Sequence, residues 1–496
     1  MPTPANEAKE LIQLIKDQNY QQAAVYLLES DNLNSVNASA WFINPKTENK
    51  NTGILCDEFL NYLLSIHESD IEPYIKGIIT GFINDDIHKN NLAQVLTNLH
   101  PILTHPNYLF YIVDSLFKKY PLQEAADLLL QSNLAKKGEG YDILFQTALN
   151  QYNAYLLLEL KKFNSVLFKE KIRNLDEEKS IRLRKLLSMP EDKYLWFSNY
   201  IQPLTHGFGF LGYQEILLVL AQVKKRKTYP FDPVLLKENE YLDFFTALKQ
   251  NHPIQKRFII SGSHFCYGEI RIDTQERAKL WLIDSLGSTK ESSNSKYFND
   301  FIFKFAETFP ENEIYVAKEK RQNSPQGCSV FALDDAMHSY TLRLPTGQND
   351  IWDYLSALKT PEKANFFNDD KAFSLSITLC PIPLSLIRTM QSKSVYDEVI
   401  PERLLSEQNL IINKKGETTK ESSQKFFKLG PQGLRNTRLE YKLEKIIQYT
   451  SDFLVNCISE KELKILMHEF TLETFKQHAA KESAEQKISN HPIPKI

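Results

Sequence analysis

Three stretches of the sequence determine the fold: SGSHFCYGEIRI at residues 261–272, KLWLIDSLGS at 279–288 and RQNSPQGCSVFALDDA at 321–336. The first two are short runs rich in β-branched and aromatic residues and bounded by Gly, Ser and Asp, which is typical of strands joined by turns. In the third, apolar residues recur at helical spacing from Cys328 onward, so we expect a helix to begin there. Together they predict a mixed α/β unit.

The sequence on either side of this unit has mainly helical patterns. Apolar residues recur at helical spacing through 8–28, 92–103 and 144–160, and again from about residue 385. The segment YFNDFIFKFAETF at 297–309 is also long enough for a helix. We therefore predict an α+β protein with an N-terminal all-helical domain at 1–205, an α/β core at 206–385 and a C-terminal helical region at 386–496. The N-terminal half is either a binding solenoid or a packing domain.

Composition excludes several classes of protein. The 496 residues carry a net charge of −3, and a protein that coats nucleic acid needs a basic excess. The five cysteines are far apart and form no CxxC pair, which argues against a disulfide scaffold or a zinc ribbon. No window approaches 18 uninterrupted apolar residues, and the N-terminus lacks a signal-peptide pattern. We expect a soluble chain with no transmembrane segment and no bound metal.

Four residues form a candidate catalytic constellation. Cys328 opens a helix, where the positive end of the helix dipole favours a thiolate. His264 would be its base, and Asp284, at the end of a neighbouring strand, would orient the imidazole. Gln322 and the backbone N–H of Cys328 would stabilise an oxyanion. Each residue alone also has a structural interpretation: a buried thiol, a strand-end histidine, a turn-forming Asp and a loop Gln.

The order and spacing of these residues resemble a group of thiol enzymes with His, acidic, Gln and Cys residues. This group includes the ubiquitin-like-specific proteases and the YopJ-family acetyltransferases. The DSL sequence beginning at Asp284 favours the proteases, because YopJ-like sequences more often have Glu at this position. The proteases, however, usually carry Trp after the His, where this chain has Phe265. The resemblance implies a cysteine-protease-like core.

The residues beyond Cys328 favour the acetyltransferases. A ubiquitin-like protease domain normally ends soon after its Cys, whereas 168 residues follow here. LCPIPLSLIRTMQS, NLIINKKGETT and GLRNTRLEYKLEKI resemble the downstream blocks of YopJ-family effectors, and TYPFDPVLL resembles an upstream block. The resemblance covers roughly residues 205–455. It implies acetyl transfer from acetyl-CoA through a Cys328 thioester, with Asp284 in place of the family's Glu.

The resemblance also implies activation by inositol hexakisphosphate. Residues 413–447 contain nine cations and four acids in a chain that is acidic overall, and converging Lys and Arg side chains are what a polyphosphate needs. The alternative is a solvated basic face. A second basic run, 224–227, has three interpretations: it joins this site, contacts a membrane or coats a helix end, and we expect the last. The residues predicted to bind the anion are Lys414, Lys415, Arg435, Arg438 and Lys442.

Three functions follow from this sequence. The first is an effector that a bacterial pathogen secretes into the host cytoplasm, where it acetylates Ser, Thr or Lys of host proteins recruited by the N-terminal helical domain. The second is a ubiquitin-like-specific isopeptidase that uses the same four residues. The third is a catalytically idle binding protein. The C-terminal region would be regulatory in the first of these.

Overall fold

A computed structural model of the chain forms two compact units, residues Met1–Gln202 and Pro203–Ile496, which we describe separately. The structure describes residues 106–131, 138–206, 211–288, 296–322, 327–358, 362–368, 373–391, 399–430, 433–457 and 459–489, together with 10–29 except Ile12 and Lys16, and Tyr62, Ser65 and Asp397. The helical pattern predicted at 92–103 lies outside these residues.

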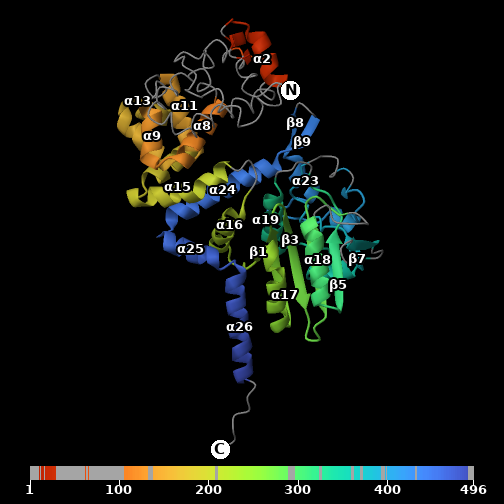
Figure 1. Cartoon of the computed structure of the whole chain (residues 1–496). Coiled ribbons are helices and arrows are strands. Elements are labelled where there is room, and N and C mark those ends of the chain that lie inside the picture. The colour runs from red at the N-terminus through yellow and green to blue at the C-terminus, as the bar shows by residue number, and fades with distance from the viewer. Residues whose placement is uncertain are drawn as a thin grey trace, which may run out of the picture. The chain divides into compact units, whose positions relative to one another are not determined.

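The first unit is helical throughout its described residues, as predicted (Figure 1). Helices that follow one another in the chain pack together, and short Asn and Asp caps separate some of them: Asn153 accepts from the N–H of Leu156, and Asn164 from that of Leu167. The helices from Pro106 on are α8 (Pro106–Lys119), α9 (Leu122–Gln131), α11 (Gly138–Asn150), α12 (Ala154–Phe163), α13 (Ser165–Arg173), α14 (Glu177–Leu187) and α15 (Glu191–His206), and α2 (Tyr20–Glu29) lies near the N-terminus.

The second unit is built on a mixed seven-stranded sheet with the order β1-β2-β3-β4-β5-β7-β6. Strands β2, β3 and β4 form an antiparallel meander, and β1, β5 and β7 pair in parallel with their neighbours β2, β4 and β5. The strands are β1 (Val234–Lys237), β2 (Ile254–Ser261), β3 (Phe265–Ile272), β4 (Ala278–Asp284), β5 (Asn312–Ala317), β6 (Glu362–Asn368) and β7 (Phe373–Cys380). The predicted α+β core is confirmed.

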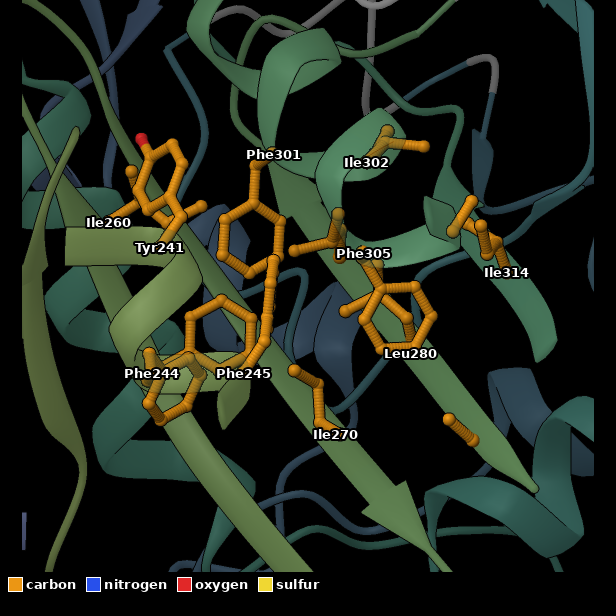
Figure 2. Packing of buried hydrophobic residues seen from close by; sticks show 14 of the residues in the cluster. Tyr241, Phe244, Phe245, Ile260, Ile270, Leu280, Phe301, Ile302, Phe305 and Ile314 are labelled. Atoms are coloured by element: carbon orange, nitrogen blue, oxygen red, sulfur yellow. The ribbon is translucent and has the colours of Figure 1, made fainter. Parts of the chain in front are cut away.

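Two helices rich in aromatic residues cover one face of the sheet. The segment predicted as a helix is α18 (Lys296–Thr308), and it packs beside α17 (Tyr241–Gln250). Figure 2 shows Phe245 and Phe301 over Ile270 and Leu280 of the strands. Phe245 and Phe301 make an edge contact with ring centroids 4.9 Å apart. This apolar layer fixes the register of β3 against β4, because a one-residue slip would turn the inward side chains outward.

Helix α19 (Cys328–Ser339) packs on the other side of β3, beneath Tyr267, which faces away from the aromatic layer by strand alternation. The remaining elements are α16 (Tyr213–Arg226), η3 (Glu238–Glu240), α20 (Ile351–Ser356), α22 (Leu405–Gln408), α23 (Thr419–Gln424), β8 (Phe427–Gly430), β9 (Gly433–Asn436), α24 (Arg438–Asn456), α25 (Glu460–His468) and α26 (Leu472–Ser489). In the described residues of the C-terminal region, the regular elements are thus helices apart from the antiparallel pair β8–β9. Among the described residues, no helix is long and apolar enough to span a bilayer.

Candidate functional site

His264 and Asp284 meet where the β2–β3 turn lies beside the end of β4. The register places Cys266 opposite Asp284, so the start of β3 is next to the last residue of β4. β2 ends at Ser261, so His264 lies in the turn after this strand and is not its last residue. Its Nε2 is 2.7 Å from Oδ1 of the fully buried Asp284. Asp284 is also a turn former, since the same Oδ1 accepts from the N–H of Leu286 at 2.8 Å.

The contacts of the His264 ring make it a stronger base. Burial on its own lowers the pKa of His264, but hydrogen bonds to Asp284, Cys266 and Cys328 outweigh burial and raise the pKa far above its ordinary value. These contacts place the imidazole between a carboxylate and two thiols. An imidazolium in that position can balance the charge of a neighbouring thiolate.

Cys328 is the first residue of α19, as predicted, and its side chain is buried. The preceding Gly327 has φ +105°, a left-handed conformation that L side chains rarely adopt. A Cβ at Gly327 would also lie 2.7 Å from Cδ2 of Leu439 in α24. Glycine is therefore required for the chain to enter the helix with the thiol directed to the His264 ring.

Gln322 is buried and fixed from β4, so the interpretation as a solvated loop residue is wrong. The backbone N–H groups of Arg321 and Gln322 both donate to the carbonyl of Ser285 at 2.8 Å. The Ser285 hydroxyl donates to Oε1 of Gln322 at 2.6 Å. This bond identifies the Gln322 oxygen as the acceptor, so its NH₂ group is the donor end of the side chain.

A buried ion pair holds Arg321 to α19. Its guanidinium donates to both carboxylate oxygens of Asp335, at 2.9 and 2.5 Å, and both side chains are 1% exposed. Burial lowers the pKa of Arg321, but the charge of Asp335 more than offsets this effect, and the net pKa is raised. Because Arg321 is the neighbour of Gln322 in the chain, this ion pair also positions Gln322 relative to the helix that carries Cys328. Asp335 is therefore structural in this arrangement.

The predicted anion-binding residues are in different environments. Arg438 is buried against Ser422 and Phe426, and its Nε has no hydrogen-bond partner among the described residues. Lys442 donates to Oδ1 of Asp334 at 2.6 Å. Lys414 and Lys415 lie exposed on a turn, and Arg435 lies in β9, where only its backbone is described.

Two cations that sequence reasoning did not assign to this site join it. Lys227 has a lowered pKa because of burial and the nearby charges of Arg226, Lys442, Lys414 and Arg388. Arg388 has its pKa lowered to about 10, mainly by burial and also by Arg438 and Arg343, although Asp334 opposes the shift. The expectation that 224–227 only coats a helix end is therefore wrong for Lys227. We call Lys227, Arg388, Lys414, Arg438 and Lys442 the cation cluster.

Asp334 is the acid that faces the cation cluster. It accepts from Lys442 and from the Thr389 hydroxyl at 2.7 Å, and it lies 3.1 Å from Nδ1 of His338. Burial alone raises the pKa of Asp334, but Lys442 and His338 bring it well below its ordinary value. Burial also lowers the pKa of both Arg438 and Lys442, and the charges of Arg438 and Arg388 lower that of Lys442 further. An excess of partly buried cations of this kind can bind a polyanion.

Comparison with known proteins identifies one family. Residues 218–449 match the family described as YopJ Serine/Threonine acetyltransferase. No curated protein matches the chain. Among solved structures, a deletion variant of AvrA with IP6 and CoA is 15% identical, covers 54% of this chain and 98% of that chain, and has a TM-score of 0.37. HopZ1a in complex with IP6 and CoA is 10% identical, covers 57% and 96%, and has a TM-score of 0.38.

Proposed function

Because the chain belongs, through residues 218–449, to the YopJ serine/threonine acetyltransferase family, we propose that it moves acetyl from acetyl-CoA to Ser, Thr or Lys side chains of host proteins by way of Cys328. The observation that carries the proposal is the His264–Asp284 pair, 2.7 Å apart, together with the interaction of the His264 ring with the thiol of Cys328, the first residue of α19. A thiol, an imidazole and a carboxylate in this order are the parts of an activated nucleophile.

Two transfers complete the reaction. The Cys328 thiol gives its proton to His264, the thiolate attacks the carbonyl of acetyl-CoA, and the tetrahedral intermediate expels the CoA thiol, which takes the proton back. His264 then removes a proton from the substrate hydroxyl or amine, which attacks the Cys328 thioester and restores the thiol. Asp284 orients the ring and balances its positive charge throughout. The kinetics should be ping-pong.

Oxyanion stabilisation is assigned to Gln322 and to the N–H of Cys328. The Ser285 hydroxyl occupies Oε1 of Gln322, which favours donation from its NH₂ group. The N–H of Cys328 is among the first four of α19, which have no acceptor within the helix. Both donors act on each of the two tetrahedral intermediates, so losing either donor lowers the rates of both half-reactions.

The cation cluster is assigned to inositol hexakisphosphate as activator. It draws cations from α16, the segment after β7, the turn at 413–416 and α24, so one polyanion would tie the core to the C-terminal region. This gives residues 386–496 a regulatory role. The N-terminal helical unit would recruit host substrates in the host cytoplasm, after secretion by a bacterial pathogen.

The direct test is the intact mass of the full chain after incubation with acetyl-CoA, with and without inositol hexakisphosphate. We expect a gain of one acetyl group that is lost in Cys328→Ala and retained in Cys457→Ala, a buried thiol outside the site. No gain in the wild-type protein, with the fold intact by circular dichroism, contradicts the proposal. Covalent capture of a ubiquitin or SUMO probe by Cys328 would support the isopeptidase function instead.

A further inference from the structure

A second thiol lies inside the candidate active site and has no part in the transfer chemistry. Cys266 is buried in β3, and its thiol lies close to the His264 ring. A ring nitrogen of His264, Sγ of Cys266 and a carboxylate oxygen of Asp284 all lie within 4.8 Å of one another. Thiolate, imidazole and carboxylate are the three kinds of protein ligand that Zn²⁺ takes.

The backbone holds these donors together. Cys266 and Asp284 are directly opposed in the antiparallel β3–β4 pair, so their side chains leave the sheet on the same face. His264 precedes β3 by one residue and is held by its bond to Asp284. Two of the three ligands are thus placed by the sheet register, and the third lies in the short turn that precedes β3.

We propose that His264, Cys266 and Asp284 bind Zn²⁺, and that the bound ion reversibly inhibits the protein. Zinc lies about 2.0–2.1 Å from nitrogen, about 2.0–2.2 Å from oxygen and about 2.3 Å from sulfur, so tetrahedral donors are roughly 3.3–3.8 Å apart. The 2.7 Å separation of His264 from Asp284 lies below that range, and the 4.8 Å limit on all the separations lies above it, so the donors must move only slightly to bind the ion. A fourth position is left for water or for the Cys328 thiolate.

Zinc binding releases protons from the ligands. The Cys266 thiol loses its proton as the S–Zn bond forms, and a His264 nitrogen must give up its proton to coordinate the ion. Coordination through the nitrogen that faces Cys328 occupies its lone pair, and coordination through Nε2 replaces the bond to Asp284 and lowers the basicity of the ring, so in either case the oriented base is lost while zinc remains. The His264 side chain is 12% exposed, which gives the ion access from solvent.

The test measures zinc affinity of the full chain by competition with a chromophoric chelator, in a Cys328→Ala background that removes the nucleophile as a ligand. We expect one Zn²⁺ per chain, at least about tenfold weaker binding in Cys266→Ala and Cys266→Ser, and unchanged binding in Cys380→Ala, a matched buried strand thiol. Co²⁺ should give a thiolate charge-transfer band that Cys266→Ala removes.

Binding and inhibition are read separately, so failure of the site is distinguishable from failure of the proposed acetyl transfer. Inhibition by Zn²⁺ is expressed relative to the rate of each variant with chelator present, and Cys266→Ser should need at least about tenfold more metal than the wild type. Equal affinity of Cys266→Ala, Cys266→Ser and the parent, or no stoichiometric zinc in the folded wild type, overturns the proposal.

Discussion

The two charged regions next to α19 are built in opposite ways. Around Cys328 every buried charge described has a close partner: His264 pairs with Asp284, and Arg321 pairs with Asp335 through two hydrogen bonds. In the cation cluster, several partly buried cations face the carboxylate of Asp334, and the pKa values of Lys227, Arg388, Arg438 and Lys442 are lowered.

This difference separates a preformed site from an incomplete one. Paired charges in a low-dielectric interior hold their geometry without a ligand. Cations that repel one another are stabilised when a polyanion arrives. We infer that the catalytic residues are in place in the free protein and that the cation cluster is the part that responds to an activator.

The largest expected effect is on the preformed site. Asp284→Asn should lower kcat on the order of 10⁴-fold, because the amide cannot balance an imidazolium and allows the wrong His264 tautomer. Acetylation rates of the purified variant would measure this loss. Asp273→Asn, a carboxylate in the turn after β3, is the matched control and should keep the wild-type rate. A loss of less than about tenfold would argue against Asp284 as the orienting group.

The ion pairs should differ in their contribution to stability. Arg321→Met leaves Asp335 buried without its partner and should lower the free energy of unfolding by about 3–5 kcal/mol. Lys442→Met should lower it by only about 1.5–3 kcal/mol, since Asp334 keeps its contacts with His338 and Thr389. Urea denaturation of the two variants compares these costs. Equal costs would remove the distinction between the two regions.

Gln322, as the oxyanion donor, and Ser285, whose hydroxyl orients its amide, should act as one unit. Gln322→Ala should lower kcat by roughly 10²–10³-fold, with a smaller loss in Ser285→Ala, which frees the amide to rotate. The KM for acetyl-CoA should change little in either variant. In the double variant the Ser285 change should add almost nothing. Additive losses would show that the Ser285 hydroxyl does not work through Gln322.

Low pH should destabilise the folded protein at the cation cluster, because Asp334 becomes protonated. The pKa of this carboxyl is lowered in the folded state, so its contribution to stability is present above the unfolded value of about 3.9 and is lost as pH falls. Asp334→Asn should therefore flatten the decline in the free energy of unfolding below about pH 5, by about 1.4 kcal/mol per unit of pKa shift. The measurement is urea denaturation at a series of pH values. Equal slopes of the free energy of unfolding against pH for the variant and the wild type would contradict this prediction.

Much of the candidate site could be predicted because each residue sits in a local pattern. Strand residues precede Asp284, a helix pattern follows Cys328, and antiparallel neighbours bring the ends of β3 and β4 together. The proximity of Cys266 to His264 also follows from the register, but the register is set by the aromatic layer on α17 and α18. The spacing of apolar residues identifies the buried face of each helix or strand. It does not show which other element packs against that face.

The cation cluster was harder to predict for the same reason. Arg388 is a single cation in an apolar block, and Lys227 belongs to a run that also contains Lys224, which pairs with Glu469. Their gathering depends on tertiary packing of segments that are far apart in the sequence, such as those of Lys227 and Lys442. Strands β6 and β7 were also missed, although Asn368, Asp369 and Asp370 between the two segments are turn-forming residue types.

The central claim, that the cation cluster is completed by a polyanion, is tested most directly by thermal melting of the full chain with inositol hexakisphosphate. At a hundredfold excess over the dissociation constant, binding to the folded form adds about 2.7 kcal/mol, so the Tm should rise by several degrees. Charge reversal at Arg388 and Arg438 should abolish the rise, and reversal at the exposed Lys461 of α25 should not. An unchanged wild-type Tm, or an equal rise in the Arg388 and Arg438 variant, would contradict the claim.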